Sequence, residues 1–247
     1  MSESSPPAVP AEPLRLAAQH DRALYARVFQ NGGRIHIPGA LADADAALLH
    51  RALTETRWSV AINGAEGVFD IPEAQFAALG DADRAKFFSA ANARGGAGGF
   101  QFLYKRLILS DHGEPFAGEP RVLARVVALL NSPAFLDFAR AVTGDASIRF
   151  ADAQATLYEP GHFLTAHDDL HEEKGRRAAF VLSMTKAWRA DFGGLLLFLD
   201  EDSHVAEGYC PAFNALNIFR VPQMHCVSAV APFAPRGRFS ITGWFRR

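Results

Sequence analysis

The sequence predicts an α+β fold in which an antiparallel β-sandwich or barrel is supported by N-terminal helices. Before Gly144, apolar residues recur at helical spacing. After Gly144, the chain divides into short apolar runs separated by turns that contain Gly and Pro. No repeat of fixed period and no linker rich in Pro, Ser or Gly divides the chain, so we expect one domain over residues 14–247.

The composition is that of a globular protein. The chain has 247 residues, of which 49% are apolar, enough for a sizeable core. A net charge of −2 does not favour binding to nucleic acid or to a membrane surface. No apolar run approaches the ~20 residues of a membrane span. Two cysteines, Cys210 and Cys226, cannot make a disulfide scaffold, which favours reduced thiols in a cytoplasmic protein.

Residues 1–13 are rich in Ser, Pro and Ala. They lack the basic and apolar regions of a secretory signal, so we expect a short disordered lead rather than a targeting segment.

Helices are predicted before Gly144 and are bounded by caps or breakers. Asn31-Gly32-Gly33 stops the first helix, and Asp43 is expected to cap the second. Pro72 is expected near the first turn of the third, with Gly95-Gly96 after its end. The expected helices cover residues 14–30, 43–53, 72–93, 122–130 and 135–142, with short strands at 34–37, 58–62 and 100–109.

Strands dominate after Gly144. Short antiparallel strands at this spacing favour a sandwich or barrel that leaves few edges exposed, with the helices covering one outer face. The expected strands cover residues 147–158, 163–169, 178–185, 195–199, 215–221, 225–230 and 239–245.

Polar residues in these late strands have the pattern of a metal site. His167 and Asp169 are two apart, so strand alternation would point both side chains to one face and Asp168 to the other. His225 begins another strand and offers a second imidazole. Two histidines and one carboxylate, with the remaining positions open, form the facial triad of non-haem Fe(II) oxygenases. The alternative to a metal site is a purely structural role for each residue. In that case His167 caps a loop, Asp169 lies in a solvated turn, and His225 is a half-buried histidine whose ring nitrogens are already hydrogen-bonded.

The last strand carries a candidate anion site. Alternation places Arg238, Ser240, Thr242 and Trp244 on one face, and the apolar residues between them on the core face. A guanidinium beside two hydroxyls is costly to bury unless an anion pairs with it, and the planar Arg fork suits a carboxylate. The alternative is a salt bridge to an acidic residue at a barrel end.

The order His167-x-Asp169, His225, Arg238-x-Ser240 resembles the 2-oxoglutarate- and Fe(II)-dependent dioxygenases. Within them it is most similar to the prolyl 4-hydroxylase-type branch, which includes prolyl hydroxylases that act on ribosomal and other proteins. The resemblance covers about residues 147–247, whereas the first half matches only in general layout. Further similar stretches are Tyr158-Glu159-Pro160-Gly161, Trp188 with Gly193-Gly194 before Leu195, and Arg238–Phe245.

The resemblance implies a double-stranded β-helix, or jelly roll, with its catalytic core at about residues 147–247. It implies that His167, Asp169 and His225 bind Fe(II). It also implies that Arg238, with Ser240 and Tyr158, binds the co-substrate 2-oxoglutarate. One departure lies in the strand 178–185, where some relatives place a second tyrosine and this chain has Leu182-Ser183-Met184.

The resemblance further implies hydroxylation of an aliphatic C–H with O2 as co-substrate, release of succinate and CO2, and ascorbate as reductant. A prolyl residue of a protein is the expected substrate. An intact Asp169 favours hydroxylation over halogenation, because related halogenases have a small residue at that position. Two alternatives remain open here: the same chemistry on a free amino acid or small metabolite, and a non-catalytic jelly-roll sensor that binds a metal or a carboxylate. The oligomeric state is left open.

Other candidates have simpler interpretations. His162 and His171 flank the triad, and we expect His171 to be solvated because it begins a polar loop. Trp244 is either a core aromatic or a wall of the site. The glycines at 95–99 favour a flexible loop, and the following segment, Phe100–Tyr104, is a candidate for substrate contact.

Overall fold

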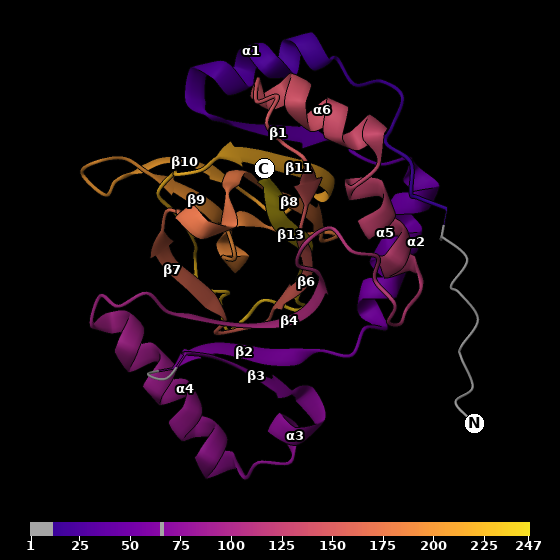
Figure 1. The fold of residues 1–247 in the computed structure, drawn as a ribbon. Coiled ribbons are helices and arrows are strands. Elements are labelled where there is room, and N and C mark those ends of the chain that lie inside the picture. Colours follow the sequence, from indigo (N-terminus) through magenta and orange to yellow (C-terminus); the bar gives the residue numbers. More distant parts are fainter. Residues whose placement is uncertain (1–11, 65–66) are drawn as a thin grey trace, which may run out of the picture.

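Antiparallel strands form a nearly closed barrel with helices packed on its outside (Figure 1). The computed structural model describes residues 12–64 and 67–247. In that range the elements are α1 (Arg22–Gly32), β1 (Arg34–Pro38), α2 (Asp43–Thr54), β2 (Ser59–Gly64), β3 (Gly67–Pro72), α3 (Glu73–Ala77), α4 (Asp81–Gly96), β4 (Phe102–Ser110), α5 (Val122–Leu130), α6 (Pro133–Thr143), β5 (Phe150–Ala151), β6 (Ala153–Tyr158), β7 (Phe163–His167), η1 (Glu172–Lys174), β8 (Arg176–Met184), η2 (Ala190–Phe192), β9 (Leu196–Leu199), β10 (Val205–Tyr209), β11 (Phe213–Arg220), β12 (His225–Val227) and β13 (Arg238–Arg246).

The strands follow one another around the barrel in the order β1-β11-β8-β13-β6-β4-β7-β12-β9-β10. We divide this order into a first layer, β1-β11-β8-β13-β6-β4, and a second layer, β7-β12-β9-β10. Strand β4 joins the two layers, because its later residues pair with β6 while Phe102 and Leu103 pair with β7. The hairpin β2–β3 extends the first layer through β4. This arrangement confirms the predicted jelly roll.

The two terminal strands of this order, β1 and β10, meet at a seam that side chains bridge. Arg34 on β1 forms an ion pair with Glu207 on β10. The rings of His36 and Tyr209 lie 5.4 Å apart across the same seam. The barrel is therefore closed here by side-chain contacts.

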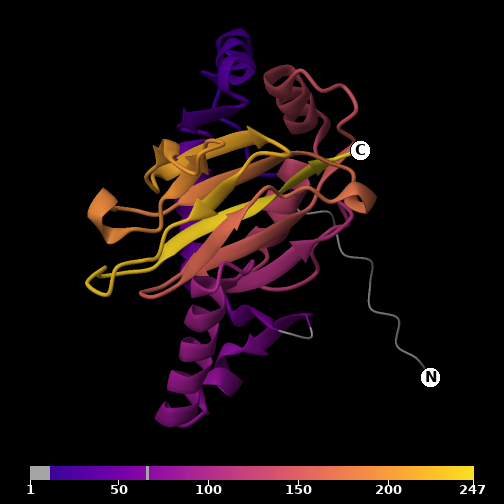
Figure 2. The same ribbon diagram turned by 90° about the vertical axis from the view of Figure 1, so that its left-hand side faces the viewer.

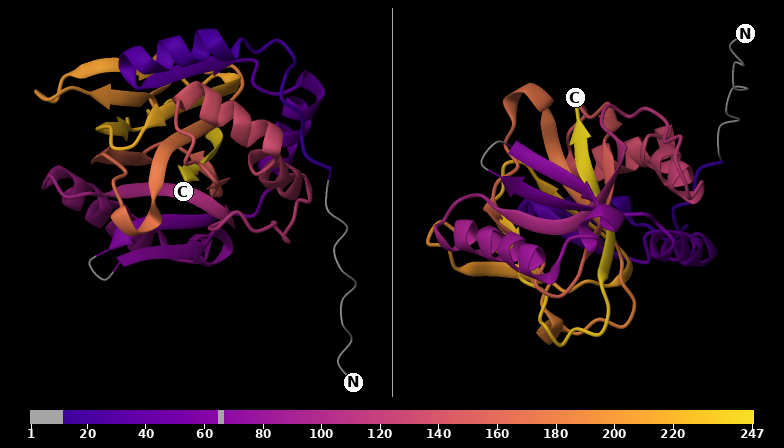
Figure 3. Two further views of the ribbon diagram at one scale, coloured as in Figure 1. Left: turned by 45° about the horizontal axis from the view of Figure 1, so that its top comes forward. Right: turned by 90° about the horizontal axis from the view of Figure 1, so that it is seen from below.

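Helices cover opposite sides of the sheet. Phe29 of α1, Phe138 of α6 and Phe180 and Phe245 of the sheet belong to one core that also includes α2 and α5. A second cluster packs α3 and α4 against β2 and β4. Figure 2 shows α1 and α6 on one side of the strands and α4 on the other, and Figure 3 shows α4 next to the β2–β3 hairpin. The expectation that the helices cover one outer face was therefore wrong: α1, α2, α5 and α6 pack on one core, and α3 and α4 pack on another.

The N-terminal expectations need two corrections. The first helix begins at Arg22 and not at Leu14, because the Asp21 side chain caps it by accepting the Leu24 N–H at 3.0 Å. The described chain before it is not helical: Leu16 forms an isolated bridge with Leu41, and a turn follows at Ala18-Gln19. Residues 1–11 of the expected lead lie outside the described residues.

The second correction concerns α2. Ala42 occupies its N-cap, and Asp43 is the first helical residue, where the helix dipole favours a carboxylate.

Several expected boundaries also differ. The helix expected at 72–93 is split at Leu79-Gly80 into α3 and α4, and α4 continues through Gly95 and Gly96. The strand expected at 147–158 is interrupted at Asp152, whose side chain accepts a main-chain hydrogen bond from Trp244. Strands β3 and β10 were not predicted, because both are largely exposed and lack an apolar alternation.

Among the described residues, no single helix is long and apolar enough to cross a membrane. Helices α5 and α6 reach the length and composition of a membrane span only when they are taken together, and they are bent by 51° relative to each other.

Candidate active site

A cavity of about 550 Å³ lies inside the barrel and is lined from both layers. The first layer contributes residues of β4, β6, β8 and β13, and the second contributes residues of β7, β9 and β12. His167, Asp169, His225 and Arg238 all line this cavity. The structure thus brings the predicted ligands and the predicted anion-binding arginine to one site.

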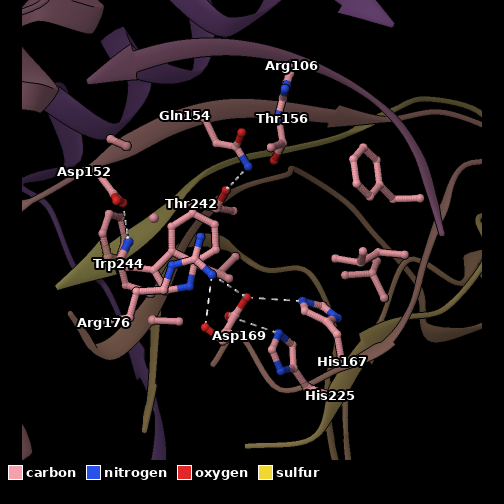
Figure 4. Close-up of a pocket in the computed structure, with 18 of the residues that line it drawn as sticks. Arg106, Asp152, Gln154, Thr156, His167, Asp169, Arg176, His225, Thr242 and Trp244 are labelled. Atoms are coloured by element: carbon pink, nitrogen blue, oxygen red, sulfur yellow. Dashed lines mark hydrogen bonds and ion pairs between the residues drawn. The ribbon is translucent and has the colours of Figure 1, made fainter. Parts of the chain in front are cut away.

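Three candidate ligand groups converge at one end of the cavity (Figure 4). Nε2 of His167 lies 3.4 Å from Oδ1 of Asp169, and Nε2 of His225 lies 3.5 Å from Oδ2. One ligand atom from each of the three residues falls within 4.8 Å of the others. This spacing allows a single ion to be held by two imidazoles and one carboxylate.

The position of Asp169 is set by a turn and not by strand alternation. Strand β7 ends at His167, and Asp169 has a φ of 64°, in the left-handed region. Aspartate tolerates this region better than most residues. The expectation that one continuous strand would present both groups was therefore wrong, although the two groups do meet.

Main-chain carbonyls fix the orientation of both imidazoles. Nδ1 of His167 lies 2.9 Å from the Thr165 carbonyl oxygen, and Nδ1 of His225 lies 2.7 Å from that of Gln223. Because a carbonyl only accepts, each Nδ1 carries the proton, and in the neutral ring Nε2 presents a lone pair to Asp169. Metal-binding histidines are commonly held in this way.

The electrostatic environment supports the same arrangement. Burial, together with the neighbouring His167, lowers the pKa of His225 to about 4, so its ring is neutral at pH 7. Burial by itself would raise the pKa of Asp169, but its neighbours His167 and His225 outweigh burial and lower it below its ordinary value, so the carboxylate is charged. Converging electron-rich atoms of this type fit a divalent cation.

Arg238 is a buried cation without a protein anion. Its exposed fraction is 3%, and its Nε has no hydrogen-bond partner. Burial lowers its pKa, and among the described residues no carboxylate pairs with it to offset this. The salt bridge that the alternative interpretation requires is therefore not formed. The Arg238 guanidinium is therefore available to pair with the carboxylate of a ligand.

Two tyrosines lie next to this arginine. The Arg238 guanidinium lies 5.0 Å from the centre of the Tyr158 ring, and the Tyr158 ring stacks on that of Tyr104 at 4.9 Å. Burial raises the pKa of both phenols. Tyr104 comes from β4, and sequence reasoning did not assign it. On β8, where the sequence departs from the family at Leu182-Ser183-Met184, the strand contributes Ala179, Phe180 and Val181 to the cavity lining and no tyrosine.

Ser240 reaches the site through a second hydroxyl. Its Oγ lies 2.8 Å from Oγ1 of Thr156, and Thr156 lines the cavity. Ser183 is the register partner of Ser240 on β8, and its buried Oγ has no hydrogen-bond partner. Neither Ser183 nor Ser240 lines the cavity itself, so Thr156 is the member of this group of hydroxyls that faces the cavity.

A cation–π pair forms another wall. The Arg176 guanidinium lies 3.6 Å from the centre of the Trp244 ring. Nη1 of Arg176 also donates a hydrogen bond to the Asp169 carbonyl oxygen at 3.0 Å. Trp244 lines the cavity, which decides between the two interpretations left open for it. Sequence reasoning missed Arg176, because an arginine at the start of a strand carries no distinctive signal.

Asp152 anchors this wall. It lies between β5 and β6 and accepts the Trp244 N–H at 2.7 Å through Oδ1. Its Oδ2 accepts from Nη1 of Arg246 at 3.3 Å. Burial raises the pKa of Asp152 to about 6, although Trp244 and Arg246 act in the opposite direction.

The remaining sequence candidates have structural positions. His162 is buried, its Nδ1 accepts the Glu159 N–H at 3.1 Å, and burial lowers its pKa to about 4. His171 is exposed, as predicted. Phe100 and Tyr104, at the two ends of the segment proposed for substrate contact, both line the cavity.

Comparison with known proteins agrees with this geometry. Residues 153–246 match the family described as the 2OG-Fe(II) oxygenase superfamily. The prolyl 3-hydroxylase OGFOD1 of Mus musculus is 37% identical over 101 residues, a match that covers 38% of this chain but only 18% of the mouse protein.

Solved structures share the fold at low sequence identity. A prolyl-4-hydroxylase of Pseudomonas putida has a TM-score of 0.58 and 18% identity, over 92% of this chain and 99% of that one. A prolyl hydroxylase of Trichoplax adhaerens, in complex with a peptide fragment of the hypoxia inducible factor oxygen degradation domain, has a TM-score of 0.58 and 14% identity, over 91% and 88% of the two chains. The segment that contains the triad and Arg238 thus belongs to the 2OG-Fe(II) oxygenase superfamily, within a jelly roll of the prolyl hydroxylase type.

Proposed function

We propose that the protein is an Fe(II)- and 2-oxoglutarate-dependent dioxygenase that hydroxylates an aliphatic C–H, with a prolyl residue of a protein as its target. One observation carries the proposal. Two lone-pair nitrogens and a carboxylate meet in the same cavity as a buried guanidinium that has no protein anion. The superfamily match and the prolyl hydroxylase relatives support both the chemistry and the choice of target.

The metal would be held by Nε2 of His167, Nε2 of His225 and the Asp169 carboxylate. This donor set suits non-haem Fe(II) and leaves the remaining positions open. The carbonyls of Thr165 and Gln223 keep both rings in the tautomer that can bind. When bound, Fe(II) with 2-oxoglutarate supplies the activation of O2 and the transfer of one oxygen to a C–H, with release of succinate and CO2.

Arg238 would orient the co-substrate. A bidentate pair with the distal carboxylate of 2-oxoglutarate would fix a flexible diacid in one direction. The Tyr158 ring supports the guanidinium from one side, and Thr156 faces the cavity from the neighbouring strand β6. This end of the cavity therefore has both charge and hydrogen-bonding capacity for a carboxylate.

Apolar side chains keep water away from the imidazoles. The Phe219 ring lies 4.6 Å from that of His225, and the Phe100 ring lies 5.3 Å from that of His167. Leu164 and Val227 line the cavity nearby. A dry surround strengthens the electrostatic interactions inside the site and limits side reactions.

An anaerobic titration tests the metal and the co-substrate together. We expect a weak visible charge-transfer band that needs both Fe(II) and 2-oxoglutarate. In the presence of O2, prolyl peptides should stimulate succinate formation more than free proline or a panel of metabolites does. Stimulation by small molecules only would replace the protein target with a metabolite. Metal binding without any succinate, uncoupled turnover included, would indicate a sensor.

We also propose a cytoplasmic location. Cys210 and Cys226 are both free thiols in the structure, which suits a reducing compartment. Fractionation of the producing cells tests this, and recovery of the protein outside the cytoplasm would contradict it.

A further inference from the structure

We infer that the mouth of the cavity binds an extended polypeptide segment with apolar residues on both sides of the target. The inference rests on the proposed function, because it specifies what that site would accept. It concerns four side chains, which we call the mouth cluster: Val68, Phe100, Ile108 and Leu170. All four line the cavity, yet they are 50%, 46%, 48% and 57% exposed.

This grouping is unusual for a protein surface. Eleven large hydrophobic side chains are exposed among the described residues, and the mouth cluster supplies four of them around one cavity. Single exposed hydrophobics are common and need no explanation, whereas a group that frames a pocket marks an interaction surface. The cluster therefore indicates a partner that removes these side chains from water.

The cluster reaches beyond the reacting centre. Phe100 packs against the ring of His167, and Leu170 directly follows Asp169. Val68 lies on β3 and Ile108 lies on β4, whereas Phe100 and Leu170 lie outside the strands. A free amino acid at the triad has no neighbouring residues with which to cover these side chains. A polypeptide has neighbours on both sides of its target, and these can cover the cluster.

Charge favours an apolar segment over a charged one. The acidic side chains that line the cavity, Asp111, Asp152, Asp168 and Asp169, are matched in number by the basic Arg106, Lys174, Arg176 and Arg238. Arg106 forms two hydrogen bonds with the Asp70 carboxylate, at 2.7 and 2.6 Å. The lining thus offers no net charge to attract an acidic or a basic segment.

Strand β3, which carries Val68, pairs only with β2 among residues 12–64 and 67–247. Because β2 lies between β3 and β4, the unpaired edge of β3 faces away from β4. An extended segment that covers Val68 at the mouth can continue to this edge and satisfy its own backbone there.

Peptide binding measured without turnover tests the inference. The probes are two fluorescein-labelled peptides of equal length with one central proline, flanked either by Leu and Val or by Glu and Lys. Anisotropy is followed with the full chain, Mn(II) and 2-oxoglutarate. We expect the apolar peptide to bind at least about tenfold tighter, because covering aliphatic side chains is favourable whereas Glu and Lys must give up water at the same surface.

Matched variants locate the surface. Val68→Ser with Leu170→Ser should weaken binding of the apolar peptide about tenfold. Val28→Ser with Val205→Ser removes side chains that are 44% and 57% exposed and that do not line the cavity, and it should leave binding unchanged. Thermal unfolding of both double variants confirms that they fold.

The binding data would overturn the inference in any of three cases: equal affinity for the two peptides, no binding of either, or equal loss in both double variants. A dimer that sedimentation detects and that the Val68→Ser/Leu170→Ser variant dissociates would place a second copy on the cluster and would also overturn it. A missing succinate signal would refute the proposed function and leave this binding result standing. Equal succinate from both peptides would refute the inference and leave the proposed function standing.

Discussion

His167 and His225 are direct register partners in the pairing of β7 with β12, and their ring centroids lie 4.2 Å apart. Strand pairing therefore sets the spacing of two of the three candidate ligands. Only Asp169 is placed by a turn. Much of the site is thus organised by the same hydrogen bonds that close the barrel, before any ligand arrives.

Asp169 should be essential for metal binding, whereas Asp168 should not. Asp169→Asn keeps the size of the side chain and tolerates the left-handed backbone, but it removes the charge. We expect Fe(II) affinity to fall at least about 100-fold in an anaerobic titration, because even residues that only hydrogen-bond to a metal ligand contribute up to that much. Asp168→Asn is the matched control, since the Asp168 carboxylate accepts the Leu170 N–H at 3.0 Å. Metal loss in the control alone would reassign the ligand to Asp168.

Arg238→Gln should raise the 2-oxoglutarate concentration needed for turnover. Removing the buried guanidinium costs at least about 2 kcal/mol of binding free energy for 2-oxoglutarate. We therefore expect the KM for 2-oxoglutarate to rise about 30-fold while the Fe(II) affinity is retained. Arg106→Gln is a suitable comparison, because Arg106 lines the same cavity but is already paired with Asp70. An unchanged KM in Arg238→Gln would exclude this residue as the anchor.

Asp152 should make stability depend on pH. Burial raises its pKa to about 6 in the folded state, against about 3.9 when unfolded. Between these values the folded state binds a proton that the unfolded state does not, so this contribution to stability falls as pH rises. Asp152→Asn removes it. The free energy of unfolding of the variant, relative to the parent, should increase from pH 4 to pH 7 by on the order of 2–3 kcal/mol. Urea denaturation at several pH values checks this, and parallel curves would contradict it.

Gly243 should not tolerate a side chain. A Cβ there would lie 2.1 Å from the Asp152 carbonyl oxygen, and β13 is held on both sides by β6 and β8. We expect Gly243→Ala to lower the free energy of unfolding by about 2–3 kcal/mol. Gly96→Ala is the control: nothing lies within 4 Å of its Cβ position in α4, so alanine should stabilise by about 0.5–1 kcal/mol. Similar effects of the two substitutions in urea denaturation would argue against the close approach at Gly243.

The face of each residue in the last strand could be predicted because alternation is imposed locally. In β13, Arg238, Thr242 and Trp244 line the cavity while Ile241 and Phe245 lie in the main core, as the sequence predicts. Ser240, expected on the same face as Arg238, is fully buried and does not line the cavity. Short apolar runs between turns likewise predict an antiparallel sandwich or barrel, whereas the more specific jelly roll was implied by the family resemblance of residues 147–247.

Features that depend on contacts between distant segments could not be predicted. Strand alternation placed His167 and Asp169 together, but the structure does so with a turn whose φ has no sequence signal when the residue is not glycine. The break at Asp152 depends on a hydrogen bond with Trp244, 92 positions away. Arg176 and Tyr104 reach the site only through the packing of β8 and β4.

The backbone at position 169 also limits how this protein can change over evolutionary time. Glycine takes a φ of 64° without cost and asparagine tolerates it, whereas β-branched residues pay for it. The replacements that the turn accepts most readily are therefore ones that remove the carboxylate and leave the loop intact. A descendant that has given up its metal can keep the parent's backbone, so fold similarity is a poor guide to whether a relative still carries out the reaction.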